Sequence, residues 1–516
     1  WEPKMVAIIT EKFKLHNASQ FVESFTEAAA STYYLFIGKA TAFTAANDGT
    51  GASDTSPPTP PDSVSDEFYF WDQMIGAKKI SSSDVIQVIS RRDWSNGTTF
   101  DMYKDDYSSL NTSDSGASSL YNSTFYFRTS ANRVYKVISN IPPGEFTAAA
   151  AFSGSEPTSE STSLFTTGGY VLKYMYTISA SNATKFLTTD FMPIVTDGTV
   201  SAAATDGAVE SFQVTNLGAG CTDGTYFTAI QGDGANAGTA SGAIARIVIS
   251  SGKVQSFGTN ASTTSGIHQA GSGYTYGKIN IASGQTFSDS GLTTASAIGG
   301  TTDPVFDVII SPKGGHGSNA IEELGAHFVM TNTTLTGAEG DDISSENDFR
   351  NVGIVVDPTN FGTSTVATAD TARQTFAIKF PTSGSGSVSG TFSADEKITQ
   401  ASTAAIGKVV EYDASLGILY YQQERHEDFG TNSLGAYVAF SGANAVTGAT
   451  SGASGTPDAT ADSAVTLANA STITFTDGYA NPELAADSGD IIYKENRRPI
   501  SRATDQTEDI KIIVEF

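Results

Sequence analysis

Histidine is the commonest metal ligand in proteins, and this chain has five: His16, His268, His316, His327 and His426. His316, Glu322 and His327 offer residue types that zinc binds, but their spacing matches neither His-Glu-x-x-His nor a related signature. The simpler interpretation of His316 is a Gly-rich loop, residues 313–317, that leads into the start of a helix. This loop also lacks the Gly-Lys-Ser/Thr ending of a phosphate-binding loop. The histidines therefore predict neither a metal site nor a nucleotide site.

The acidic residues and the single cysteine do not form a recognisable catalytic or metal motif either. The acidic clusters at Asp101–Asp106 and Asp341–Asp342 lack the spacing of an EF-hand loop, so we interpret both as solvated loops. With 55 Asp and Glu residues, accidental carboxylate pairs are certain, and the sequence nominates no glycosidase pair. Cys221 has no neighbouring histidine, and no Gly-x-Ser-x-Gly motif occurs. We therefore predict no enzyme activity, no metal and no cofactor.

The composition of the 516 residues excludes several further classes of protein. The net charge is −26, which argues against partners that need a basic surface, namely nucleic acid and anionic membranes. The sequence contains no apolar run of the ~18 residues that a membrane span needs. One cysteine excludes a disulfide scaffold and a site with several thiolate ligands. Charged residues are only 16% and glycines number 50, which indicates many turns and small-residue packing.

Short apolar runs between turns predict a mainly β protein. Strands are expected at Tyr33–Ile37, Asp84–Ser90 and Tyr170–Ile178, and a hairpin at Phe125–Ile138. Two capping boxes predict helix starts, one at Asn17–Gln20 and one at Asn319–Glu322. Alternating apolar residues from Ile510 to Phe516 predict a last strand paired within the fold. The expected fold is an antiparallel β-sandwich core with a few flanking helices and small inserted β-modules.

Two sections rich in Gly, Ser, Thr and Ala interrupt the more ordinary sequence. The first contains an internal echo, because Gly218–Gly224 and Gly271–Gly277 are both Gly-x-Gly-x-Thr-x-Gly turns, in which glycine allows a positive φ. We therefore predict five parts: residues 1–198 as the N-terminal part of the core, 199–300 as an inserted β-module, 301–384 as core, 385–480 as a second module, and 481–516 as C-terminal core strands.

Two short motifs are candidates for an interface or for a structural clamp. In Arg91-Arg92-Asp93-Trp94, the tryptophan could anchor a partner, but we favour the interpretation that it fills the protein's own core while Asp93 pairs with an arginine. In Asn496-Arg497-Arg498, the adjacent arginines point in different directions, and at least one should bind a carboxylate. We lean towards an interface or an inter-strand clamp for this second motif.

The C-terminal motif also carries a resemblance. Tyr493 to Ile500, followed by Asp505 to Glu508, is similar to the closing pattern Tyr-x-Glu-Asn-Arg-x-Pro-Ile and Asp-Gln-Thr-Glu of the dimeric baseplate wedge protein family of T-even-type myophages. Further matching pieces follow in the family's order: Ala7–Phe13, the Pro-rich loop Ser56–Ser63, Arg91–Trp94, Gly169–Tyr174, Phe349–Ile354 and Asp357–Pro358. The chain resembles a longer, marine- or cyanophage-like form, because its two Gly/Ser/Thr-rich sections depart from the shorter members.

The resemblance implies a structural subunit of a contractile-tail virion, made in the host cytoplasm. It implies a homodimer that contacts other baseplate wedge subunits and takes part in baseplate assembly and rearrangement. Two alternatives stay open at this point. One is a host-surface binder whose modules recognise carbohydrate or a receptor, with Tyr274, Tyr276, Tyr420 and Tyr421 as weak candidates. The other is an enzyme that acts on cell-surface glycan.

Overall fold

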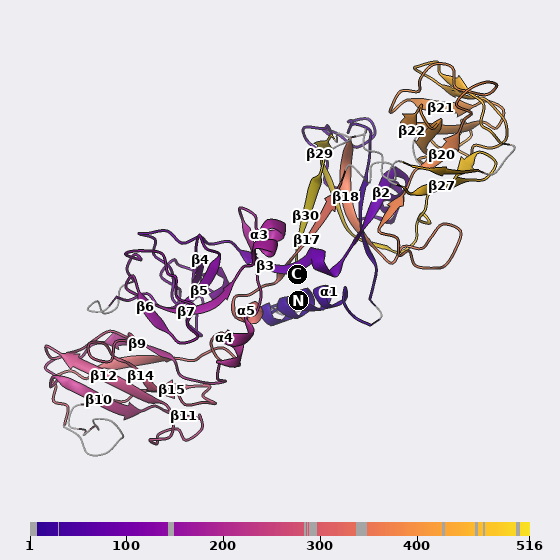
Figure 1. Cartoon of the computed structure of the whole chain (residues 1–516). Coiled ribbons are helices and arrows are strands. Elements are labelled where there is room, and N and C mark those ends of the chain that lie inside the picture. The colour runs from indigo at the N-terminus through magenta and orange to yellow at the C-terminus, as the bar shows by residue number, and fades with distance from the viewer. Residues whose placement is uncertain are drawn as a thin grey trace, which may run out of the picture. The chain divides into compact units, whose positions relative to one another are not determined.

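The computed structural model describes residues 8–28, 30–142, 149–282, 285, 287, 297–336, 348–425, 429–459, 463–467, 470–501 and 506–516 (Figure 1). The protein is mainly β, with several antiparallel sheets and few helices, as the sequence predicted. It divides into two compact units. The first contains Trp1–Gln20, Ile86–Met330 and Ile513–Phe516, and the second contains Phe21–Val85 and Thr331–Ile512. The predicted five-part division stays a prediction.

An antiparallel sheet with an aromatic core forms the first part of the first unit. Its strand order is β4-β5-β7-β6, with β4 at Tyr126–Arg128, β5 at Arg133–Ser139, β7 at Tyr170–Thr177 and β6 at Phe165–Thr167. The predicted hairpin is confirmed, and Asn132 in its turn has a positive φ of 62°. Both faces of β7 are buried, because aromatic rings such as Phe127 and Tyr135 surround it.

Small sheets follow in the same unit. Strand β9 (Ser211–Asn216) pairs with β16 (Val305–Ile309), and β11 (Gln231–Gly232) pairs with β15 (Gly277–Lys278). A four-stranded sheet is formed by β10 (Gly224–Ala229), β12 (Ile244–Ser250), β13 (Lys253–Val254) and β14 (Gly266–Gln269). In the two echoed turns, Gly218, Gly220, Gly271 and Gly273 all have φ between 64° and 73°. The expected need for glycine at these turns is therefore confirmed.

A further sheet has the order β30-β17-β3-β8, with β30 at Glu508–Glu515, β17 at Phe328–Leu335, β3 at Val85–Ser90 and β8 at Phe191–Pro193. The last strand is thus paired as predicted, and Ile510 and Ile512 are buried. The helices α3 (Ala180–Phe186), α4 (Gly198–Ala202) and α5 (Ala320–Glu323) are short. Helix α1 covers Glu11–Glu23, so the predicted start at Asn17 is wrong. The helix begins earlier because the Thr10 hydroxyl accepts a hydrogen bond from the Phe13 N–H.

The second unit is built on a five-stranded antiparallel sheet in the order β19-β2-β1-β18-β29 (Figure 1). Its strands are β19 (Thr371–Arg373), β2 (Met74–Ile80), β1 (Tyr33–Gly38), β18 (Phe349–Val356) and β29 (Asp490–Ile500). Helix α2 (Val64–Gln73) starts at Ser63, whose side chain caps the Asp66 N–H. The helix packs on the sheet through Phe70 and Trp71, and the Phe70 ring meets Phe36 edge to face at 6.0 Å.

A seven-stranded sheet completes the second unit, in the order β25-β24-β21-β22-β23-β20-β28. Its strands are β25 (Ser454–Gly455), β24 (Val446–Gly448), β21 (Lys397–Gln400), β22 (Ala405–Asp413), β23 (Ile418–Gln422), β20 (Phe376–Lys379) and β28 (Tyr479–Ala480), and a hairpin joins β26 (Ser463–Thr466) to β27 (Thr472–Phe475). The successive pairing of β21, β22 and β23 confirms the meander that the sequence indicated.

Candidate functional site

The first predicted motif, Arg91–Trp94, is held by contacts within the first unit. Asp93 binds Arg91 at 2.6 Å and Arg128 at 2.7 Å, and the Arg92 guanidinium lies 4.4 Å from the centre of the Tyr126 ring. Burial opposes ionisation of Asp93, but hydrogen bonds from Arg91 and Arg128 outweigh it and lower the pKa of the carboxyl. The expected pairing of Asp93 with an arginine is present.

Trp94 packs inward. Its indole contacts the Phe152 ring edge to face at 5.6 Å and lies against the core around β5 and β7. This is the arrangement that the core interpretation predicted for Trp94. Its role at an interface stays a prediction.

The second motif lies on β29, at the edge of the five-stranded sheet. The Asn496 side chain donates to the Pro58 carbonyl at 2.9 Å, and Arg497 binds Glu495 at 3.1 Å. Arg498 is exposed, and none of the described residues forms an ion pair with it. The expectation that one of the two arginines binds a carboxylate therefore holds. The two motifs belong to different units, so the structure does not bring them together.

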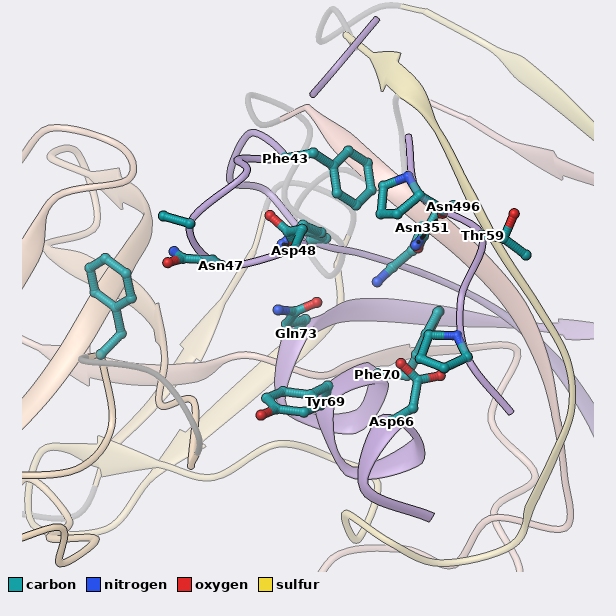
Figure 2. A pocket seen from close by; sticks show the side chains of 15 residues that line it. Phe43, Asn47, Asp48, Thr59, Asp66, Tyr69, Phe70, Gln73, Asn351 and Asn496 are labelled. Carbon is teal, nitrogen blue, oxygen red and sulfur yellow. Dashed lines mark hydrogen bonds and ion pairs between the residues drawn. The ribbon is translucent and has the colours of Figure 1, made fainter. Parts of the chain in front are cut away.

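Asn496 lines a cavity of about 570 Å³ that lies wholly within the second unit (Figure 2). Segments far apart in the sequence form its walls: the loop after β1, the Pro-rich loop before α2, one face of α2, strands β18 and β29, and Phe429. The lining residues are Lys39, Phe43, Ala46, Asn47, Asp48, Pro58, Thr59, Pro61, Asp66, Tyr69, Phe70, Gln73, Asn351, Phe429 and Asn496. A second cavity of about 500 Å³ shares Pro58, Thr59 and Asn496 and runs beside Ile491–Asn496 of β29.

An arginine on β18 fixes the loop that carries Phe43 and Asp48. Arg350 is buried, and its Nε and Nη2 each donate to the carboxylate of Asp54 at 2.9 Å. The Phe43 N–H donates to the same carboxylate at 2.9 Å. These bonds, with Arg350 first among them, lower the pKa of Asp54. The loop is therefore held by a charged hydrogen-bond network rather than by apolar packing alone.

Each charged residue of the cavity wall has an ion-pair partner. Lys39 Nζ lies 2.8 Å from Asp48, and Lys494 Nζ lies 2.6 Å from Asp66. Both carboxylates of the cavity thus hold a lysine, which leaves no unpaired acid for general acid–base chemistry among its lining residues. The wall is polar, but its charge is balanced.

Asn351 is the unusual residue of this cavity. It is only 1% exposed, it lies opposite Gly38 on β1 and Asn496 on β29, and its Oδ1 has no hydrogen-bond partner within the described chain. Figure 2 shows the side chain reaching towards the space between Gln73 and Asp48. Asn351 was not among the residues singled out from the sequence. The available signal was a polar amide that directly precedes the apolar run Val352–Val356.

The three residues whose types zinc binds, His316, Glu322 and His327, are not grouped as metal ligands in the described structure. His316 is buried against the Tyr103 ring at 4.9 Å, and its two ring nitrogens have no partner in the described structure. Burial, together with the nearby Lys136 and Lys173, holds the pKa of His316 well below its usual range. His327 lies 3.8 Å from Glu11 instead. Within the described ranges, no three His, Cys, Asp or Glu residues are grouped as metal ligands.

A buried charge cluster surrounds His316, and no sequence pattern indicated it. Lys136 on β5 and Glu323 at the end of α5 are 0% and 2% exposed, and Nζ and Oε2 are 2.8 Å apart. Lys136 lies directly opposite Lys173 on β7. Burial raises the pKa of Glu210, which completes the cluster, while both lysines act against this shift. Glu323 also accepts the N–H groups of Gly317 and Asn319 at 2.7 and 3.2 Å, so it pins the Gly-rich loop.

The other candidates have structural surroundings. Tyr274, Tyr420 and Tyr421 are buried and only Tyr276, at 57% exposure, faces solvent, so three of the four tyrosines do not form a recognition surface. Cys221 is buried, and burial raises the pKa of its thiol. Burial opposes ionisation of Asp101, but hydrogen bonds from Ser115 and Thr124 lower its pKa. Asp341, Asp342, His426 and Asp505 lie outside the described residues.

In the comparison with known proteins, the chain matches one family model. The family model described as Bacteriophage T4, Gp8 matches residues 7–144 and 461–516, which together are less than half of the chain. The match supports a structural role in a T4-type baseplate and therefore a place in the virion tail. A search of curated proteins found no match. No helix of the described residues is long and apolar enough to span a bilayer.

Proposed function

We propose that this protein is the dimeric wedge subunit of a contractile-tail phage baseplate, in a long, cyanophage-like form. It acts as a homodimer that links neighbouring wedge proteins, joins baseplate assembly and takes part in the rearrangement of the baseplate. It is made in the host cytoplasm and has no catalytic role.

The observation that carries this proposal is where the two matched segments lie in the fold. Residues 7–144 supply β1, β2 and α2, and residues 461–516 supply β29. In the second unit, β1 and β29 flank the same strand, β18. Side chains also join the two segments directly, from Asn496 to Pro58 and from Lys494 to Asp66. The matched residues of the second unit thus pack together rather than forming two unrelated ends.

We also propose that residues 199–300 and 385–480 are insertions into this core. This is supported by two hydrophobic clusters, one formed almost entirely by residues 209–298 and one formed by residues 378–453. Insertions into surface loops cost little closure entropy, so the parent fold can carry them.

The test is the copy number and the neighbours of this chain in a map of the virion. Two copies in each wedge, in contact with each other, are expected. Sedimentation of the purified protein should give about twice the chain mass of 53.8 kDa. A single copy per wedge, or a location outside the baseplate, would contradict the proposed function. A monomer in solution together with two touching copies in the virion would mean that the dimer forms only during assembly.

A further inference from the structure

We propose that the two cavities beside the Pro-rich loop form one groove that binds an extended, uncharged segment of another polypeptide. The groove is defined as the 570 Å³ cavity around Asn351 together with the 500 Å³ cavity along Ile491–Asn496. The two share three lining residues, Pro58, Thr59 and Asn496, so they meet at the point where Asn496 binds the Pro58 carbonyl. The groove is a property of the second unit and does not depend on the function proposed above.

The first observation is the unsatisfied side-chain oxygen of Asn351, Oδ1. A buried amide oxygen without a partner costs free energy, so natural proteins rarely keep one unless a ligand or water satisfies it. A carboxamide presents a donor and an acceptor side by side. In an extended chain, the N–H and C=O of one residue point to the same side, as they do in antiparallel pairing. The N–H of an extended residue in the cavity would therefore satisfy Asn351 Oδ1, and the C=O of the same residue would face the Asn351 Nδ2 group.

The second observation is the free edge of β29. This strand is the last in its sheet, and among the described residues no hydrogen bond reaches its backbone from the side opposite β18. The Pro-rich loop faces this edge, but Pro57, Pro58, Pro60 and Pro61 have no N–H and cannot pair with it. The wall from Ile491 to Asn496 is about 17 Å long at the usual rise per strand residue. This is room for an added strand of about five residues.

The charges and the apolar rings of the groove wall indicate which kind of polypeptide segment it can bind. The charged residues that line the cavity around Asn351 each have an ion-pair partner, Lys39 with Asp48 and Asp66 with Lys494. In the second cavity Glu495 pairs with Arg497, and Asp62 is exposed at the rim. An ionic side chain of a ligand would therefore enter without a counter-charge. The apolar part of the wall around Asn351 consists of Ala46, the rings of Phe43, Tyr69, Phe70 and Phe429, and two prolines, which suit apolar side chains. A sugar could satisfy Asn351, but it would leave the strand edge unpaired.

The experiment uses the full-length protein and three probes. These are a capped octapeptide of alternating valine and threonine, the same peptide with lysine in place of threonine, and maltohexaose. Binding is measured by isothermal titration calorimetry, and hydrogen exchange reports on the amides of residues 491–496. The neutral peptide is expected to bind at least tenfold more tightly than the lysine peptide and to slow exchange along β29.

Two matched variants test the role of Asn351. Asn351→Leu should reduce affinity for the neutral peptide at least tenfold while the melting temperature stays equal or rises, because an unpaired buried amide is removed. Asn47→Leu, at the exposed rim of the same cavity, should change the affinity less than twofold. A lower melting temperature for Asn351→Leu would overturn the reasoning, since the amide would then have internal partners.

Three further outcomes would also overturn the proposal. The first is that the neutral peptide fails to bind. The second is that maltohexaose binds and that its affinity falls in Asn351→Leu, which would make the groove a saccharide site. The third is that exchange along β29 slows with protein concentration alone, in which case a second copy of the chain fills the groove.

Discussion

Removing one member of the buried pair Lys136–Glu323 should destabilise the first unit far more than removing both. The change is made in three variants: Lys136→Met, Glu323→Gln and the double substitution. Lys136→Met leaves two buried carboxylates, Glu323 and Glu210, with Lys173 as the remaining neighbouring cation. Glu323→Gln keeps an oxygen that can accept from the loop N–H groups, but it leaves two opposed lysines. The double variant removes the charges together.

The magnitude follows from the geometry. At 2.8 Å and an effective dielectric constant of 20, the attraction between the two charges is about 6 kcal/mol. Desolvation of both ions offsets most of it in the intact pair. In each single variant the free energy of unfolding should therefore fall by about 3–5 kcal/mol, because one charge stays buried without its partner. The double variant should lose less than about 2 kcal/mol, so the two substitutions should not be additive.

Native-state hydrogen exchange of the amides in β5 and β7 is the suitable assay, because a chain with two units need not unfold in one step. The slowest amides of these strands report the free energy of opening around the pair. If each single variant lowered this free energy of opening by less than about 1 kcal/mol, the pair would not hold the unit together as proposed. A double variant whose loss equals the sum of the two singles would also refute the reasoning.

Three further predictions concern the motif and the last strand. Trp94→Ala should cost about 2–4 kcal/mol of stability in thermal unfolding, because the indole packs on Phe152 and the core; unchanged stability with loss of assembly would instead place Trp94 at an interface. Asp93→Asn should cost at most about 1 kcal/mol at pH 7, because the carboxylate is 45% exposed. The pKa of Asp93 is lowered in the folded protein, so its carboxylate stabilises the fold above the unfolded pKa of about 4, and this stability is lost as the pH falls through the folded pKa. Asp93→Asn should therefore lose less stability on acidification than the unchanged protein. The same dependence of stability on pH in both proteins would contradict this. Deleting residues 510–516 should give insoluble protein, since two buried isoleucines and a sheet strand are removed; a soluble product with the same melting temperature would show that the strand is dispensable.

Local sequence patterns predicted the strands, turns and caps that depend only on residues close together in the sequence. Alternating apolar residues gave β7 and β30, and turn glycines gave the two echoed turns with positive φ. The Asn319 cap was also found, since its side chain accepts the Ile321 N–H at 3.1 Å. However, the residue that reaches back to Asn319 is Glu323 and not Glu322, because the helix is only four residues long and Glu323 is drawn inward by Lys136.

Features that depend on long-range register could not be predicted. Lys136 and Lys173 are 37 positions apart, and only the pairing of β5 with β7 sets them opposite each other. The cavity is a similar case. Asn351 and Asn496 become neighbours through the register of β18 with β29, and Asn496 was nominated for its motif rather than for any cavity. Composition and spacing carry no information about such pairings.

The sheet of the second unit has a consequence for the time course of synthesis. Leu35 on β1 pairs with Ile354 on β18, and Gly353 on β18 pairs with Lys494 on β29, so this sheet joins strands from the beginning and the end of the printed sequence. At about 5–20 residues per second, β29 leaves the ribosome roughly 25–90 s after β1. Until β18 emerges, β1 pairs only with β2 and its other edge has no neighbour, so its apolar residues are an aggregation hazard. A ribosome-bound chain is therefore expected to depend on chaperones until its last strands emerge, and a prematurely terminated chain cannot close this sheet.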